Sequence, residues 1–158
     1  MKLPKTLQKG FTLVELIIVI AIIGVLAAVL ITIIDPLDKI NAANDSGVLS
    51  TIAQLGKAND TYAVNHSNLY VDANTFDAAV LDLNASGDLK YSDLDAPTNY
   101  TYYYFAPANC DTTPANCTSY VFGVNLESKK YASTPYFIYA NGKSCLIATA
   151  PTAASVCP

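Results

Sequence analysis

Hydrophobic residues are concentrated in one block near the start of the chain. Of the 24 positions from Phe11 to Ile34, 20 are apolar, and no polar side chain occurs between Leu16 and Ile31. A helix of this length extends roughly 36 Å, at about 1.5 Å per residue, and the hydrocarbon core of a bilayer is about 30 Å thick. The block at 11–35 therefore predicts a helix that spans a membrane.

Two positions are expected to disturb the helical run. Pro36 removes the backbone hydrogen bond to the carbonyl of Thr32 and disfavours helical geometry at Asp35. A kink or a short unwound piece is therefore predicted at Asp35-Pro36. Gly24 is a second and weaker point, because glycine is a poor helix former.

After the proline, the spacing of apolar residues predicts a second, amphipathic helix at 37–66. The residues that share one face of it are Val48, Ile52, Leu55, Asn59 and Tyr62. The opposite face carries Ser50, Lys57 and Asp60, and we expect Asp45-Ser46-Gly47 to fray or bend the helix. A helix with one apolar face needs a partner layer, such as a sheet.

The sequence period changes to two in the last third of the chain. A connecting segment at 67–97 contains one short helical candidate, Thr75–Leu83, and four β-like segments follow it. These segments are Asn99–Phe105, Tyr120–Leu126, Tyr136–Ala140 and Ser144–Thr149. Asn141-Gly142, between the last two, is a strong hairpin signal. The pattern predicts an α+β fold, in which a long N-terminal helix, half membrane-spanning and half amphipathic, packs on a small antiparallel sheet within residues 98–158.

Charge is distributed unevenly along the chain. Residues 1–10 contain Lys2, Lys5 and Lys9 and no acid, whereas the rest has 6 Lys against 13 acids, and the chain has no Arg. The positive-inside rule places the lysine-rich leader on the cytoplasmic side of the membrane. An acidic body without arginine offers no general clamp for phosphates, so we expect no nucleic-acid partner.

Glu15 is the one charged residue within the apolar block. A carboxylate at the centre of a membrane helix costs about 2.5–3.5 kcal/mol, and less near an end. We expect no partner for it nearby in the chain, except an amine created by cleavage just before Phe11. Two simpler alternatives are a secretory signal peptide cut near Ala27-Ala28 and a plain uncleaved anchor.

The segment Lys9-Gly10-Phe11-Thr12-Leu13-Val14-Glu15-Leu16 resembles the class III signal of type IV prepilins and type II secretion pseudopilins. The resemblance implies that a prepilin peptidase removes residues 1–10 by cutting between Gly10 and Phe11. The same enzyme would N-methylate Phe11. Glu15 would then meet the positive N-terminus of a neighbouring subunit during filament assembly. Major pilins of this family often carry a proline where this chain has Thr32.

The same resemblance implies a structural protein that polymerises helically with itself, with the head at 36–158 outside the membrane. Its implied partners are the prepilin peptidase, an inner-membrane assembly platform with its ATPase, and other minor pilins. The bacterial precursor would cross the inner membrane once and then enter a surface filament or a periplasmic pseudopilus. A type IV pilus subunit is favoured, and the alternative is a secretion pseudopilin or a minor or competence pilin. A non-polymerising membrane-anchored binding module is the remote alternative, and it would keep residues 1–10.

Four cysteines lie beyond the two predicted helices, at Cys110, Cys117, Cys145 and Cys157. Four cysteines allow three connectivities. Their spacing favours two local pairs, Cys110–Cys117 and Cys145–Cys157. Disulfides fit an oxidising compartment outside the cytoplasm.

Three further patterns carry weaker signals. Asp82–Asp93 resembles an EF-hand calcium loop, but Lys90 at a ligand position and a short Asp at the last one favour a polar turn. The aromatic run Asn99–Phe105 is interpreted as a strand, because no basic residues are interleaved for base stacking. His66 is the single histidine and has no Cys or Ser beside it for nucleophilic catalysis. We therefore expect no enzymatic activity and no cofactor.

Overall fold

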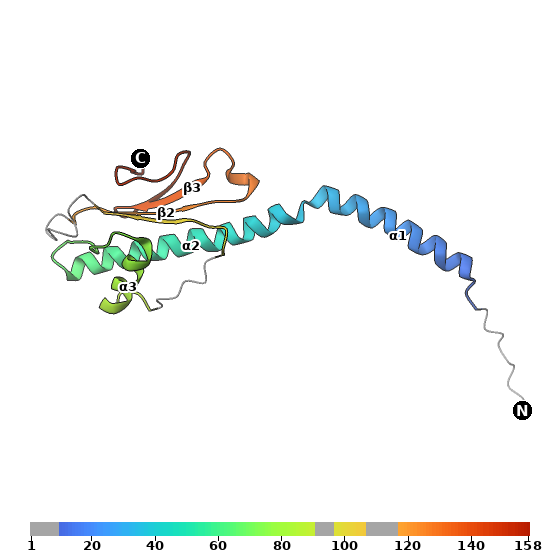
Figure 1. Ribbon diagram of the computed structural model, residues 1–158, viewed down its shortest axis with the longest axis horizontal. Helices are drawn as coiled ribbons and strands as arrows, with labels where there is room; N and C mark the ends of the chain where they lie inside the picture. The colour runs from blue at the N-terminus through green and yellow to red at the C-terminus, as the bar shows by residue number, and fades with distance from the viewer. Residues whose placement is uncertain (1–9, 91–96, 107–116) are drawn as a thin grey trace, which may run out of the picture. The chain divides into compact units, whose positions relative to one another are not determined.

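The computed structural model describes residues 10–90, 97–106 and 117–158 (Figure 1). The chain divides into two compact units, Met1–Leu37 and Asp38–Pro158. The elements in chain order are α1 (Leu13–Ile34), α2 (Pro36–Asn65), α3 (Phe76–Ser86), β1 (Tyr102–Phe105), β2 (Val121–Asn125), η2 (Lys129–Tyr131), β3 (Tyr136–Ala140) and β4 (Lys143–Ile147). This is the α+β arrangement that the sequence pattern predicts.

The apolar block forms α1, drawn in blue in Figure 1. The helix starts two residues later than the apolar block, because Thr12 takes the N-cap position with extended backbone geometry. None of the residues of α1 is buried within the structure. Among the described residues, α1 is the helix that is long and apolar enough to cross a membrane. Its apolar surface therefore needs lipid or other protein to cover it.

The helical run is interrupted at the predicted place. Asp35 caps the end of α1 in a left-handed conformation, with φ of 44°, and α2 begins at Pro36. A proline at the first helical position is tolerated, since the amide it lacks would have no partner within the helix. α1 continues through Gly24 without a break, and a kink at this residue stays a prediction. Glycine weakens a helix but, unlike proline, removes no backbone donor.

α2 buries the face that the apolar spacing predicts. Ile52, Leu55 and Asn59 are fully buried, and Val48 nearly so, whereas Lys57 on the opposite face is exposed. The expected fraying at Asp45-Ser46-Gly47 is wrong, because α2 is continuous there. The reason is tertiary: the Asp45 side chain is buried and hydrogen-bonded to a distant segment, which outweighs the low helix propensity of these residues.

The four strands form one antiparallel sheet in the order β1-β2-β3-β4. β3 has the predicted bounds, and the other strands differ from the predicted ranges by one to three residues at their ends. Asn141 and Gly142 form the hairpin turn between β3 and β4, with φ of 49° and 81°. Positive φ at both positions is the requirement of a type I′ turn, which explains the Asn-Gly pair.

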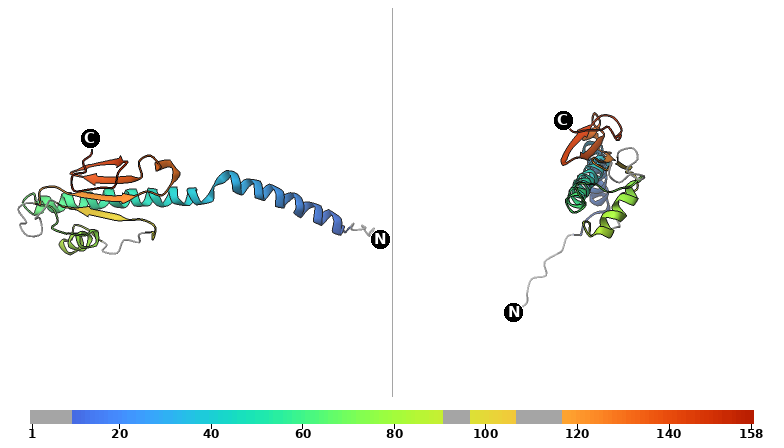
Figure 2. Two further views of the ribbon diagram at one scale, coloured as in Figure 1. Left: turned by 45° about the horizontal axis from the view of Figure 1, so that its top comes forward. Right: turned by 90° about the vertical axis from the view of Figure 1, so that its left-hand side faces the viewer.

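Both faces of the sheet are covered. One face packs on α2 and α3 and contributes Tyr104, Phe122 and Val124 to the main core. Figure 2 shows the sheet running along α2 and the C-terminal segment crossing its other side. There Val121 and Ile138 form a second, smaller cluster. β2 is consequently buried on both sides, although its sequence alternates as if one side faced water.

α3 begins one residue after its N-cap, Thr75, whose hydroxyl accepts a hydrogen bond from the amide of Ala78 at 3.2 Å. The helix packs against β1, and the ring centroids of Phe76 and Tyr102 lie 4.8 Å apart. Gly87 ends α3 with φ of 85°. α3 thus extends three residues past the predicted helical candidate and includes the start of the calcium-like sequence.

Candidate processing and assembly site

The predicted cleavage point lies outside helical structure. Gly10 and Phe11 precede the N-cap of α1, both are exposed, and Phe11 retains 89 % of its accessible surface. Apart from its neighbours in the chain, no described residue has an atom within 4 Å of the position that a side chain on Gly10 would occupy. The peptide bond that a peptidase would cut is therefore non-helical and open to approach.

Thr12 and Glu15 form a reciprocal capping box at the start of α1. The backbone amide and the hydroxyl of Thr12 each donate to Oε2 of Glu15 at 2.8 Å. In return, the amide of Glu15 donates to the Thr12 hydroxyl at 3.3 Å. The expectation that Glu15 has no nearby partner in the chain is therefore wrong. The Thr-x-x-Glu spacing is itself a capping-box signature and is the signal from which this contact could have been found.

The capping box lowers the cost of holding Glu15 in an apolar helix. Two donors satisfy Oε2, and the positive end of the helix dipole favours a carboxylate in the first turn. Both bonds go to the same oxygen, so Oε1 has no hydrogen bond within the described residues. The carboxylate can thus keep its contact with Thr12 and still accept a donor from outside the chain.

The rest of α1 offers an apolar surface with few other features. Its exposed side chains include Leu16, Ile20, Val25 and Ile31, each with more than half of its surface accessible. The Thr32 hydroxyl donates to the carbonyl of Val29 at 2.8 Å, so this polar group is satisfied within the helix. A helix of this kind is compatible with both lipid and a bundle of like helices.

In the head, Asp45 of α2 binds the segment that follows β2 through hydrogen bonds. The amides of Glu127 and Ser128 donate to its two oxygens at 2.9 and 3.0 Å. The Tyr100 hydroxyl donates to Oδ1 at 2.7 Å. Burial acts to raise the pKa of Asp45, but the hydrogen bonds from Ser128, Glu127 and Tyr100 outweigh it and hold the pKa below its ordinary value.

Asp60 makes a second link from α2 to the sheet. The Tyr120 hydroxyl lies 2.7 Å from its Oδ1, and the Tyr139 hydroxyl donates to its Oδ2 at 3.0 Å. Burial and the contact with Asp60 raise the pKa of Tyr139 to about 12. The same two causes raise the pKa of Tyr120 strongly. Both tyrosines therefore stay protonated at neutral pH and act as donors.

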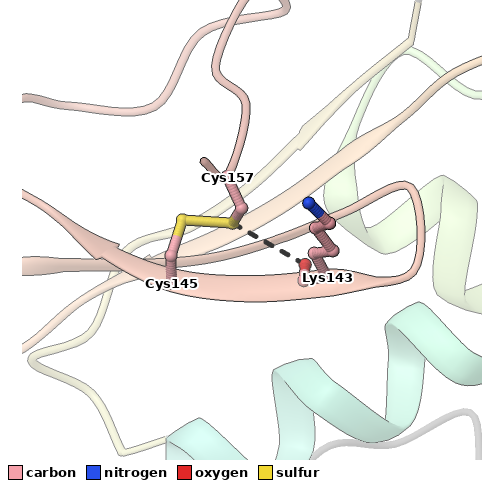
Figure 3. Close-up of a disulfide and its surroundings, with 3 residues drawn as sticks. All are labelled: Lys143, Cys145 and Cys157. Carbon is pink, nitrogen blue, oxygen red and sulfur yellow. Dashed lines mark hydrogen bonds between the residues drawn. A yellow bond between two sulfur atoms is a disulfide. The ribbon is translucent and has the colours of Figure 1, made fainter.

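The structure contains a disulfide between Cys145 on β4 and Cys157 near the C-terminus, with Cα atoms 5.6 Å apart (Figure 3). This is the local pairing that the cysteine spacing favours. Cys117 is also disulfide-bonded. Cys110, its predicted partner, lies outside the described residues.

The structure gives little support to a functional role for the weaker sequence patterns. Residues 82–86 of the calcium-like sequence lie in α3, whereas an EF-hand needs loop geometry at these positions, and Asp93 lies outside the described residues. No cluster of three metal-ligating side chains occurs within the described ranges.

His66 is exposed and stacks on Tyr62 with ring centroids 3.8 Å apart. Tyr104 of the aromatic run is a core residue, and its hydroxyl donates to the Val71 carbonyl at 2.6 Å.

Comparison with known proteins gives a match for one segment of the chain. Residues 5–31 match the family model described as the prokaryotic N-terminal methylation motif. The match includes Gly10, Phe11, the capping box and most of α1. No curated protein and no solved structure matches the chain. Residues 5–31 are therefore the class III signal peptide that type IV pilins and pseudopilins share.

Proposed function

We propose that the chain is a structural subunit of a type IV pilus-like filament. The observation that supports this proposal most is the conjunction of the methylation motif with Glu15 at the start of an otherwise unbroken apolar helix. In a discarded signal peptide or a plain anchor, the role of this carboxylate would end with capping the helix. In a filament subunit it would have a second role, since it can also pair with the amine of a neighbour.

In this proposal the prepilin peptidase cuts between Gly10 and Phe11 and methylates the new amine. Before assembly, the subunit is anchored in the inner membrane, with α1 in the bilayer and residues 36–158 outside the cytoplasm. The assembly platform and its ATPase then move it into the filament, where minor pilins accompany it. The α1 helices bundle in the filament core, and the acidic heads cover the outside.

Electrostatics supports Glu15 as the residue that sets the axial position of each subunit. An unpaired ammonium and an incompletely paired carboxylate are both costly in an apolar surrounding. Bringing the Phe11 amine of one subunit to Glu15 of another relieves both costs at a single axial offset. Head-to-tail contacts of this kind do not close on themselves, so one subunit type can build an open filament.

The proposal is tested by separating processing from assembly. Glu15→Leu is expected to leave cleavage before Phe11 largely intact and to abolish surface filaments. Asp77→Asn, which removes an exposed carboxylate from the head, is the matched control and should assemble as the native chain does. Filaments in native number from the Glu15→Leu variant would overturn the proposal. Processed protein that stays in the envelope, with few filaments even in the native chain, would instead favour a secretion pseudopilin or a minor pilin.

A further inference from the structure

The acceptor pattern for N-linked glycans, Asn-x-Ser/Thr with any residue but proline in the middle, occurs six times in the chain. The asparagines of these motifs are Asn44, Asn59, Asn65, Asn84, Asn99 and Asn116. Random placement of the asparagine, serine and threonine residues along the chain would give about two such motifs. A glycan is bulky and needs a surface position in an exported segment, so the structure discriminates among the six.

Two of the motifs lie wholly within α2. Asn59 is fully buried, and its Oδ1 accepts a hydrogen bond from the amide of Val71 at 3.0 Å. Asn44 is half-buried in the first half of the helix. Side chains two positions apart on a helix do not face each other, so the amide and the hydroxyl of such a motif point to different sides. A transferase that recognises both groups together is poorly served at either position.

Two further motifs have acceptor amides that already donate within the chain. Nδ2 of Asn84, in α3, donates to the carbonyl of Leu89 at 3.1 Å. Nδ2 of Asn65, the last residue of α2, donates to Oδ1 of Asp88 at 3.5 Å. Transfer of a sugar to either nitrogen would have to displace these contacts. Asn116 lies outside the described residues.

The motif Asn99-Tyr100-Thr101 differs from these in backbone and in exposure. It lies in the non-helical segment that leads into β1, and both Asn99 and Thr101 are exposed. The amide of Tyr100 donates to the carbonyl of Pro97 at 3.2 Å, which closes a turn at Asn99. Within the described ranges, the hydrogen bonds of Asn99 and Thr101 use backbone groups alone. The two side chains that a transferase recognises are therefore accessible and unengaged there.

The backbone of this motif is held in place from the inside. The ring of Tyr100 packs against the main core, and its hydroxyl donates to Oδ1 of Asp45 on α2 at 2.7 Å. Asn125, at the end of β2, accepts the amide of Thr101 at Oδ1, and its Nδ2 donates to the carbonyl of Asn99 at 3.5 Å. The middle residue thus anchors the motif in the head, while the residues on either side present their side chains to solvent.

We propose that Asn99 is a site of N-linked glycosylation, with the Thr101 hydroxyl as the second recognition element. The donor is an oligosaccharide joined through a diphosphate to a membrane lipid. Nδ2 of Asn99 forms a bond to C1 of the first sugar, and the bond from C1 to the diphosphate oxygen breaks. The departing lipid diphosphate takes up the proton that Nδ2 loses. The inference rests on residues 36–158 lying outside the cytoplasm, which is part of the proposed function, and adds a covalent modification to the head.

Mass spectrometry of the chain purified from the producing cells tests the site. The native chain should be heavier than its processed sequence by a whole number of sugar residues, and electron-transfer fragmentation should locate the added mass on Asn99. Thr101→Val keeps the size of the side chain without its hydroxyl and should abolish the added mass, whereas Thr101→Ser should retain it. Thr98→Val removes the neighbouring exposed threonine, which is outside the motif, and as the matched control should leave the added mass unchanged.

Asn99→Gln completes the test, because it removes the acceptor and leaves the Thr101 hydroxyl in place. Added mass that survives this change is carried by another residue and would overturn the inference. A native chain without added mass, or a glycan that Thr101→Val retains, would overturn it as well. A chain that is cleaved before Phe11 and enters filaments without a glycan overturns the inference and leaves the proposed function standing. A chain that keeps residues 1–10 contradicts the proposed function, and the same spectrum still shows whether Asn99 is modified.

Discussion

The carboxylate of Glu15 accepts two hydrogen bonds from Thr12, one from its amide and one from its hydroxyl, both at 2.8 Å. The contact gives Glu15 a hydrogen-bonding partner within its own chain. It lowers the cost of a carboxylate in an apolar helix. In the proposed filament, Oε1, which has no hydrogen bond within the described residues, can accept the amine of a neighbouring subunit without loss of the Thr12 contact.

Substitutions at the capping box separate helix capping from charge. Thr12→Val should destabilise the first turn of α1 by about 1 kcal/mol, the usual effect of losing an N-cap, and Thr12→Ser should leave it unchanged. Amide chemical shifts of residues 13–15 in detergent micelles measure this difference. Equal fraying in the Val and Ser variants would contradict a capping role for the hydroxyl.

Glu15→Gln keeps the geometry of the capping box, because a glutamine can also accept the bond from the N-cap amide. It removes the charge that a neighbouring ammonium would meet. We therefore expect a native start of α1 and few or no filaments, measured by electron microscopy of sheared material. Filaments in native number would show that the charge of Glu15 is not needed for assembly.

Asp45→Asn should lower the free energy of unfolding of the head by about 2–3 kcal/mol at pH 7, since the new amide group would face backbone donors. The native pKa of Asp45 is held below its ordinary value, so the stabilisation is fully present above about pH 4, the range of an unfolded Asp, and is lost as the pH falls through the folded pKa. Denaturant melts of the native chain and the variant should therefore converge in strong acid. A difference that does not depend on pH would contradict this account.

Replacing a glycine of α2 by alanine should change the stability of the head in opposite directions at two positions. A Cβ on Gly56 would overlap the ring of Tyr139, whereas a Cβ on Gly47 would meet no atom of the described residues within 4 Å. Gly56→Ala should destabilise the head by about 1–3 kcal/mol through overpacking. Gly47→Ala should stabilise it by about 0.5–1 kcal/mol, because alanine favours helix. Thermal melts of the two variants check the signs, and a stabilising Gly56→Ala would contradict the close packing of α2 on β3.

The disulfide Cys145–Cys157 fastens the C-terminal segment to β4. Pro151 of that segment is buried, and its ring lies against Gly123 of β2. Replacing both cysteines by serine should lower the free energy of unfolding by about 2–3 kcal/mol, as expected for a loop of this length. Hydrogen exchange of residues 121–123 should also become faster. Unchanged exchange there would show that the segment stays in place without its covalent link.

Sequence periodicity was sufficient to predict the helices and strands, because the signals for them are local. The apolar block, the proline at 36 and the Asn-Gly turn each dictate backbone geometry over a few residues. The ends of the strands were less accurate, because partners far away in the chain decide them. Thus Tyr100, expected in a strand, sits in a turn before β1 and donates its hydroxyl to Asp45.

The polar residues of α2 show what periodicity cannot supply. Asp45 was expected to loosen the helix, and Asp60 to face water, yet each carboxylate binds groups that come from the sheet side of the head. These contacts join residues 55 to 83 positions apart, so no short-range pattern predicts them. The capping box differs in this respect, since its two residues are three positions apart and carry a recognisable spacing.

The most direct test of the central claim is mass spectrometry of the chain's N-terminus in two fractions of the producing cells, sheared surface filaments and membranes. If the chain is a pilus subunit, the filament fraction should contain it in abundance. After digestion at lysine, its first peptide should start at N-methylated Phe11 and end at Lys39. Protein that retains Met1 and is confined to the membrane fraction would contradict processing and assembly, and would leave a membrane-anchored module as the account of this chain.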